Sequence, residues 1–270
     1  MTTAQQSHVQ YITEECAQFH AKHNMPDHFP PSLNPETDGE LICQMNSRCI
    51  SYYYTTKVFI KRQPHADEMG MDGYGKPVVI PYIADRIRNE AAALRFIAAH
   101  TSIPVPRLLG LDEEHGLVFL KTSFVDRGVT LDSLDAATRP AATAAVERQL
   151  QEDILPQLRG LRRNFMGSAD PQLPVIPPHR LWRFKESRVW PALPCATDEY
   201  VFCHTDLNAA NIFVDPTTYK IVSIIDWETA GFFPPEWERP YWTARDHCER
   251  SQITEAAKAE ELALFEVENY

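Results

Sequence analysis

The most informative stretch of this chain is His204-Thr-Asp-Leu-Asn-Ala-Ala-Asn-Ile-Phe-Val-Asp-Pro-Thr-Thr-Tyr-Lys-Ile-Val-Ser-Ile-Ile-Asp-Trp-Glu228. It holds two short apolar, β-branched runs, Ile212–Val214 and Lys220–Ile225, on either side of a turn signal at Pro216-Thr217-Thr218. Runs of this kind around a turn predict an antiparallel β-hairpin.

Polar residues stand before the first strand and after the second strand of the predicted hairpin. Asn211 stands just before the first strand and Asp226 just after the second, so the two are expected to lie close together, because a hairpin returns to where it began. Asp206 is one tight loop away. An amide and a carboxylate beside a second carboxylate suit a divalent cation with oxygen ligands and a nearby general base. The sequence therefore predicts a functional site at this end of the hairpin.

The composition narrows the class of protein. With 270 residues, 44% of them hydrophobic, the chain can form one large domain or two smaller ones. A net charge of −11 argues against a nucleic-acid-binding or anionic-membrane surface. No segment has the length of a membrane span, residues 1–23 lack the apolar core of a secretory signal, and the six cysteines form no CxxC pair. We therefore expect a cytoplasmic protein with buried free thiols and with no nucleic-acid or membrane partner.

The first half of the chain predicts a small sheet with one helix. Short segments rich in aromatic and β-branched residues are expected to be strands: Leu41–Met45, Cys49–Tyr54, Lys57–Arg62 and, later, Gly116–Phe124. The glycine- and proline-containing segment Gln63–Pro81 is expected to be a long loop.

A helix is predicted over Ala84–His100, because apolar residues such as Ile87 and Leu94 recur there at helical spacing. Glu90 falls on the same apolar stripe. A carboxylate in that position is costly unless it has a cationic partner.

The second half is mainly helical. Pro140–Leu161 predicts a helix that Pro156 should kink or shorten, and Ile253–Val267 predicts a closing helix. Arg159–Arg188, with seven basic and two acidic residues among several prolines, is expected to be irregular. The chain thus divides into an N-terminal extension with a weak helix (residues 1–40), a strand-rich part (41–122) and a helical part (123–270).

Five segments together carry a resemblance to a known family: Val58-Phe-Ile-Lys-Arg62, Arg88-Asn-Glu-Ala-Ala-Ala-Leu-Arg-Phe-Ile97, Thr101-Ser-Ile-Pro-Val-Pro106, Val201-Phe-Cys-His-Thr-Asp-Leu207 and Ile224-Ile-Asp-Trp-Glu-Thr-Ala-Gly-Phe-Phe-Pro234. From about Leu41 to Trp242 the chain resembles the aminoglycoside phosphotransferase-like (APH) family, and within it the fungal members of unassigned substrate. The resemblance implies an α+β, protein-kinase-like bilobal fold, with a mainly antiparallel N-terminal lobe and a mainly helical C-terminal lobe. It also implies ATP or GTP as the phosphoryl donor, together with Mg²⁺.

The hairpin segment matches the family's catalytic motifs by position. The match implies that Asp206 is the catalytic base and that Asn211 and Asp226 hold Mg²⁺. His204 is expected to brace the catalytic loop, since the acceptor hydroxyl is served by the aspartate in kinases.

The strand-rich part is expected to supply the nucleotide contacts. By position, Lys61 would contact the α- and β-phosphates, and Glu90 would pair with Lys61. Thr122, Ser123 and Phe124 fall where the segment between the lobes usually contacts the adenine edge. The implied activity is transfer of a phosphoryl group to a small hydroxyl-bearing acceptor.

The nature of the acceptor stays open. Several acidic residues follow Asp226, namely Glu228, Glu236, Glu238 and Asp246. They suit a cationic acceptor such as an aminoglycoside or amino alcohol, and they equally suit a solvated surface.

Two features depart from the family pattern. No glycine occurs between Gln44 and Lys57, where a flexible phosphate-covering loop is expected, and Thr205 replaces the usual Gly or Arg after the histidine. The missing glycines leave open a second hypothesis, a catalytically weak, pseudokinase-like nucleotide-binding or scaffold protein. A third is a metal-dependent hydrolase that uses His204, Asp206 and Asp226 as ligands.

Overall fold

The computed structural model describes residues 13–14, 17–18, 32–47, 49–71, 74–125, 127–181, 189–197 and 199–265. The predicted helix at Val9–His23 lies almost entirely outside these residues. The chain forms two compact units. The first is built from described residues of 1–88 and 107–126, and the second from described residues of 89–106, 127–183 and 187–270. The predicted α+β class is confirmed.

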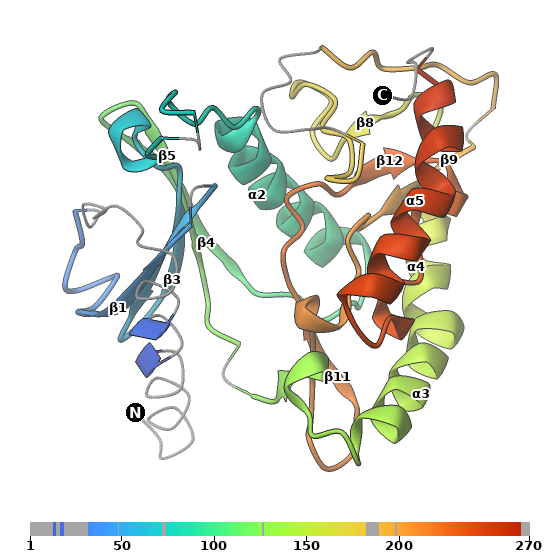
Figure 1. Cartoon of the computed structure of the whole chain (residues 1–270), viewed down its shortest axis with the longest axis horizontal. Helices are drawn as coiled ribbons and strands as arrows, with labels where there is room; N and C mark the ends of the chain where they lie inside the picture. The colour runs from blue at the N-terminus through green and yellow to red at the C-terminus, as the bar shows by residue number, and fades with distance from the viewer. Residues whose placement is uncertain are drawn as a thin grey trace. The chain divides into compact units, whose positions relative to one another are not determined.

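The first unit contains a five-stranded antiparallel sheet with the strand order β1-β2-β3-β5-β4 (Figure 1). Its strands are β1 (Leu41–Asn46), β2 (Ser51–Thr55), β3 (Phe59–Arg62), β4 (Leu108–Glu114) and β5 (Leu117–Thr122). The four predicted strands correspond to β1, β2, β3 and β5. Strand β4 escaped prediction because it is an edge strand with a largely exposed, partly acidic sequence.

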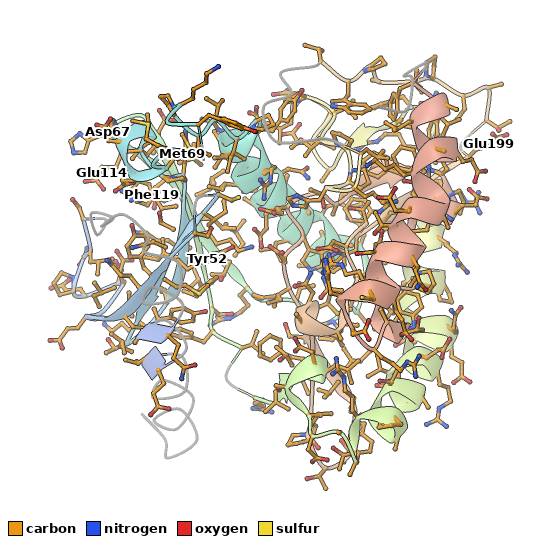
Figure 2. The ribbon with its side chains drawn as sticks, in the orientation of Figure 1. Tyr52, Asp67, Met69, Glu114, Phe119 and Glu199 are labelled. Carbon is orange, nitrogen blue, oxygen red and sulfur yellow. The ribbon has the colours of Figure 1, made fainter. Side chains whose placement is uncertain are left out.

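The core of this sheet follows the alternation of buried and half-buried residues along β2. Tyr53 is buried with Val58, Ile60 and Phe119 in one cluster. Burial raises the pKa of the Tyr53 hydroxyl to about 12. Figure 2 shows the side chains of Phe119 and of Tyr52, the neighbour of Tyr53 in β2, on this sheet.

The segment after β3 is mostly loop, as predicted, with one short 3-10 helix, η1 (Ala66–Glu68). Glu68 is buried, accepts a hydrogen bond from the backbone N–H of His65 at 2.7 Å, and pairs with Arg62 at 2.6 Å. Asp67 and Met69 of this turn lie at the same end of the sheet as Glu114 (Figure 2).

Helix α2 (Ile83–His100) confirms the predicted helix. Its apolar stripe of Ile87, Leu94 and Ile97 is buried, and so are three polar or charged residues, Arg86, Asn89 and Glu90. The boundary between the two units falls inside this helix, between Arg88 and Asn89.

The long helix predicted at Pro140–Leu161 is interrupted, as Pro156 predicts. It consists of α3 (Arg139–Gln149), a π-helical turn η3 (Leu150–Ile154) and α4 (Leu155–Gly160). Proline has no N–H and its ring displaces the carbonyl four residues earlier. The helix widens ahead of it, and the N–H of Leu155 reaches back to the carbonyl of Leu150. Pro156 then occupies the first turn of α4, where a missing N–H costs little.

Two small sheets complete the second unit. The first has the order β11-β10-β6, with β6 (Val129–Thr130), β10 (Ile212–Val214) and β11 (Ile221–Ile224). The second has the order β7-β9-β12-β8, with β7 (Arg162–Arg163), β8 (Gly167–Ser168), β9 (Tyr200–Cys203) and β12 (Gly231–Phe233). The expectation that Arg159–Arg188 is irregular is therefore wrong for β7 and β8. Two-residue strands are set by tertiary pairing, which leaves no periodic signal in the sequence.

The closing helix α5 runs over His247–Ala263, so it begins six residues before the predicted start (Figure 1). Asp246 explains this earlier start, because its side chain accepts a hydrogen bond from the N–H of Glu249 and caps the helix. The end of the predicted helix, from residue 266, lies outside the described residues.

The described part of the chain contains no helix long and apolar enough to cross a membrane. Its five cysteines are free thiols. Cys203 is buried, whereas Cys248 is exposed and does not fit the expectation of buried thiols.

Candidate active site

The predicted hairpin is present and joins the polar residues as expected. Strand β10 pairs with β11 in antiparallel register, with Ile212 opposite Ile224. Beyond the last pair, the N–H of Ile225 donates to the carbonyl of Asn211 at 3.0 Å. The backbones that carry Asn211 and Asp226 are therefore held side by side. A short 3-10 helix, η4 (Ala209–Asn211), connects this point to Asp206.

Asp206 has one engaged and one open carboxylate oxygen. Its Oδ1 accepts a hydrogen bond from Nη2 of Arg250, in the first turn of α5, at 2.6 Å. Its Oδ2 has no hydrogen-bond partner among the described residues. The backbone carbonyl of Asp206 accepts from Nδ2 of Asn211 at 2.9 Å and from the N–H of Asn208 at 2.8 Å. The backbone of this loop is thus fixed while one carboxylate oxygen stays available.

Oxygen ligands suitable for a cation gather at this same open end of the hairpin. Ligand oxygens of Glu90, Asp226 and Glu228 all lie within 4.8 Å of one another. Because Nδ2 of Asn211 is used by Asp206, the amide of Asn211 keeps its oxygen for another partner. Three carboxylates this close repel one another unless a cation or proton intervenes. An all-oxygen donor set fits a hard cation such as Mg²⁺.

Glu228 also belongs to this group of carboxylates, although the sequence analysis predicted only Asn211 and Asp226 as metal ligands. It is buried, and Nε2 of His179 lies 2.9 Å from its Oε1. The carboxylate of Glu90, predicted to pair with Lys61, lies beside those of Asp226 and Glu228 within the second unit.

His204 has a structural role. It is fully buried, its Nε2 lies 2.8 Å from the carbonyl of Ile225, and its Nδ1 accepts from the N–H of Asp206 at 3.3 Å. Its ring also packs against Trp227, with 4.5 Å between ring centroids. With both nitrogens used by backbone groups, His204 ties the catalytic loop to the end of β11. This argues against the hydrolase hypothesis, which needs a free nitrogen as a metal ligand.

Thr205 adopts a left-handed backbone with φ of 72°. This conformation is strained for a β-branched residue, whereas a glycine would adopt it without cost. Every polar group of Thr205 is held. Its N–H donates to the Glu238 carboxylate at 3.2 Å, its carbonyl accepts from Arg180 at 2.9 Å, and its hydroxyl donates to the carbonyl of Thr229 at 3.1 Å.

The carboxylate of Glu238 holds the backbone of the loop that leads to Asp206. This carboxylate also accepts the N–H of His204 at 2.5 Å. Burial raises the pKa of the Glu238 carboxyl, although His204, the two N–H groups and Arg180 favour the charged form. Local sequence patterns give no signal for this role, since Glu238 lies more than 30 residues beyond the loop.

Arg180 ties the same loop to α5. Its guanidinium donates to Glu261 at 2.6 Å and 3.1 Å, to the carbonyl of Thr205 and, at 2.8 Å, to the carbonyl of Trp237. Burial acts against the charged form, but the bonds to Glu261 outweigh it and keep the pKa of Arg180 above its usual range. Arg239 also donates to Glu261, at 2.9 Å.

Asn89 fixes the segment that follows Asp226. Its Nδ2 donates to the carbonyls of Glu228 and Ala230 at 3.0 Å and 2.8 Å, and its Oδ1 accepts from the N–H of Ala169 at 2.9 Å. The local sequence pattern gives no signal for this role, because the burial of Asn89 is evident only in the folded chain.

The predicted nucleotide contacts lie in the first unit. Lys61 is buried in β3, with Tyr52 and Leu120 as its strand partners. Its pairing with Glu90 of the second unit stays a prediction.

The segment predicted to contact the adenine edge follows β5. Thr122 ends that strand and is buried. Ser123 exchanges two hydrogen bonds with Arg107, one from its N–H at 2.9 Å and one to its Oγ at 3.0 Å. Phe124 stacks on Tyr54 with 6.5 Å between ring centroids. These contacts fix the position of Ser123 and Phe124 beside β4 and β2.

Comparison with protein families identifies the class. The model of the phosphotransferase enzyme family APH matches residues 80–262, more than half of the chain. The chain therefore belongs to this family, and the predicted resemblance to the APH family is confirmed, whereas its narrower placement among the fungal members stays a prediction. A search of curated proteins found no match.

Several solved aminoglycoside phosphotransferases are similar to the chain. One is a thermostable mutant of APH(4)-Ia in a ternary complex with AMP-PNP and hygromycin B, with 16% identity and a TM-score of 0.46 over 85% of this chain and 82% of that one. APH(3'')-Id from Streptomyces rimosus, in complex with ADP and streptomycin, has 16% identity and a TM-score of 0.43 over 82% and 85%. The GDP and kanamycin complex of APH(2")-IIia has 12% identity and a TM-score of 0.46 over 90% and 82%.

Proposed function

We propose that this protein transfers the γ-phosphoryl group of a nucleoside triphosphate to a hydroxyl group of a small-molecule acceptor. One observation carries the proposal. One oxygen of the Asp206 carboxylate has no hydrogen-bond partner among the described residues, and the loop that carries it is held in place by hydrogen bonds. A backbone hydrogen bond between Asn211 and Ile225 connects this loop to the group of carboxylates around Asp226. Membership of the phosphotransferase enzyme family supports it.

In this proposal Asp206 is the base. Its open Oδ2 accepts the proton of the acceptor hydroxyl and aligns that hydroxyl for in-line attack on the γ-phosphorus. His204, Thr205 and Glu238 contribute by holding the loop rigid, so that little reorganisation is needed during the reaction.

Asn211 and Asp226 would hold Mg²⁺, with Glu228 and Glu90 beside them. When bound, the cation neutralises charge on the phosphates as the phosphoryl group is transferred. Chelation of Mg²⁺ should abolish turnover. The substitution Asp226→Asn should raise the Mg²⁺ concentration required for half-maximal rate at least tenfold, whereas Asp132→Asn, at an exposed position of the same unit, should not.

For the nucleotide, we propose that Lys61 contacts the α- and β-phosphates, that Glu90 orients Lys61, and that Thr122, Ser123 and Phe124 contact the base edge. The solved relatives bind either adenine or guanine nucleotides, so ATP and GTP are both candidate donors. A Lys61→Met variant should weaken binding of Mg·ATP or Mg·GTP, as measured by the ligand-induced shift in melting temperature.

The decisive test is Asp206→Asn, assayed by nucleotide consumption against a panel of hydroxyl-bearing acceptors. Loss of the base should lower kcat by about 10²–10⁴-fold, the usual contribution of general acid–base catalysis. Binding of Mg·nucleotide should stay within about twofold, because Asp206 is not assigned to the nucleotide. Asp132→Asn is the matched control. Unchanged turnover in Asp206→Asn would refute the assignment, and so would loss of nucleotide binding in that variant.

A nucleotide-binding scaffold is the second candidate function. The observation that favours it is the turn between β1 and β2, which has no glycine and is closed by side-chain bonds instead. The Ser47 hydroxyl accepts from the N–H of Ile50 at 2.9 Å and donates to the carbonyl of the same residue at 2.7 Å. A protein that shifts its melting temperature with Mg·nucleotide, yet consumes none with any acceptor, would support the scaffold over the transferase.

A further inference from the structure

A cationic side chain from α5 stands directly beside the proposed base. Arg250 donates from Nη2 to Oδ1 of Asp206 at 2.6 Å. The side chain of Arg250 is 41% exposed, whereas that of Asp206 is 17% exposed. The guanidinium of Arg250 is therefore accessible to a ligand from solvent.

Arg250 has binding capacity to spare. A guanidinium group has five N–H donors, and only the bond to Asp206 is made among the described residues. The guanidinium also lies 5.4 Å from the ring centroid of Tyr241, which supports one face and orients the fork. The remaining donors are free to bind a planar or tetrahedral oxyanion, for which the arginine fork is well suited.

Two of the four acidic residues that could have favoured a cationic acceptor, Glu238 and Asp246, are committed elsewhere. Glu238 binds the backbone N–H groups of His204 and Thr205, and Asp246 caps α5. Glu261, on the same helix as Arg250, is buried and accepts from two other arginines. The charged side chain that contacts the Asp206 carboxylate directly is therefore the cationic Arg250.

We propose that Arg250 is a specificity-determining residue that selects acceptors carrying an oxyanion, either a carboxylate or a phosphate, a few bonds from the hydroxyl that is phosphorylated. An acceptor hydroxyl bonded to Oδ2 of Asp206 lies about 5 Å from the guanidinium, given ordinary hydrogen-bond lengths. A substituent two to four bonds away can span this distance. The inference rests on the proposed function and narrows its substrate class, which the sequence leaves open, to acceptors that carry an anionic group.

Chemically matched acceptors test the inference directly. The panel pairs glycerate with glyceramide, glucuronate with glucose, and glucose 6-phosphate with glucose, and it adds choline and kanamycin as cationic members. Turnover is measured for the wild type, Arg250→Gln, Arg250→Lys and Arg245→Ala. Arg245 is the control, because it is exposed, precedes the same helix and pairs only with Glu249 among the described residues. The carboxylate and phosphate pairs show which oxyanion is preferred.

The wild type should use the anionic member of at least one pair with a kcat/KM at least tenfold above that of its neutral partner. Arg250→Gln should remove most of this preference by raising KM for the anionic member, so that kcat/KM falls at least fivefold more for the anionic member than for its neutral partner. Arg250→Lys should retain part of the preference, because it keeps the charge but not the fork. Arg245→Ala should behave like the wild type.

Two results would overturn the inference while leaving the proposed function intact. One is a wild type that prefers neutral or cationic acceptors. The other is an equal fall in kcat on all acceptors in Arg250→Gln, which would make Arg250 a positioning residue for the base. A wild type that phosphorylates no acceptor of any charge would overturn the proposed function, and the inference with it.

Discussion

Replacing Arg180 by methionine should strongly destabilise the second unit. Arg180 and Glu261 are both almost fully buried, with 4% and 1% of their side chains exposed. The substitution keeps a long apolar side chain but removes the charge and all four hydrogen bonds, to Glu261 and to the carbonyls of Thr205 and Trp237.

The magnitude follows from what is left unpaired. Removing one partner of a buried ion pair costs about 3–5 kcal/mol, because the other charge stays buried. Arg239 still donates to Glu261 at 2.9 Å, which moves the expectation toward 3 kcal/mol. The freed carbonyls of Thr205 and Trp237 each add part of a desolvation cost of about 1–3 kcal/mol. We therefore expect a loss of about 4 kcal/mol, which for a unit of this size is roughly 10 °C in Tm.

Urea unfolding followed by tryptophan fluorescence measures this loss. The described tryptophans, Trp190, Trp227, Trp237 and Trp242, all lie in the second unit, so the signal reports on that unit. The control Arg245→Met removes an exposed arginine and should cost less than about 1 kcal/mol.

The double variant Arg180→Met/Glu261→Met separates charge pairing from packing. Because it removes both buried charges together, it should be less destabilised than the sum of the single variants by about 2 kcal/mol or more. A single variant Arg180→Met within 1 kcal/mol of the wild type would refute the reasoning. Strict additivity in the double variant would show that Arg180 and Glu261 do not act as a pair.

Three further predictions concern stability. Asn89→Leu should cost about 3 kcal/mol or more in urea unfolding, because three buried backbone groups lose their partner; a loss below 1 kcal/mol would mean that water replaces the amide. Gly231→Ala should cost about 1–3 kcal/mol in the same assay, since the added Cβ would lie 2.4 Å from the backbone oxygen of Gly167; an unchanged Cm would show that β8 moves freely. Lys121→Met should destabilise most at neutral pH. Burial alone would raise the pKa of Asp38, but Lys121, 2.9 Å away, and the N–H of Asn34 bring it below its ordinary value of 3.8. A carboxyl group whose pKa is lowered in the folded state stabilises the fold above its ordinary pKa, and this stabilisation is lost as the pH falls through the lowered pKa. The difference in Tm between Lys121→Met and the wild type, followed by circular dichroism, should therefore shrink below about pH 4, and a constant difference would contradict the pairing.

Local patterns predicted the elements that carry the chemistry. The hairpin around Pro216, helix α2 and the interruption at Pro156 all follow from residue periodicity or from the covalent limits of proline, which operate within a few residues. The placement of Asn211 beside the start of the Asp226 segment follows from the return of a hairpin, so it too could be predicted.

The supports of the site could not be predicted in the same way. Arg180, Glu238 and Glu261 act on Thr205 from segments up to 56 positions away in the sequence, and each looks like an ordinary surface charge when read alone. Strands β7 and β8 are too short to show a period, and their pairing is set by β9 and β12. Only the folded chain reveals which charges are buried.

The left-handed Thr205 connects these supports to the proposed chemistry. A glycine would adopt this backbone without strain, so its loop would need little external bracing. A threonine adopts it only where the surroundings over-determine it, and here a carboxylate, a guanidinium and the backbone of Thr229 do so. The same helix that carries Glu261, the partner of Arg180, also carries Arg250, the partner of Asp206. Helix α5 therefore determines both the geometry of the loop that holds the proposed base and the charge beside it. On this reasoning, acceptor specificity in this protein has to be sought in α5 as well as in the catalytic motif.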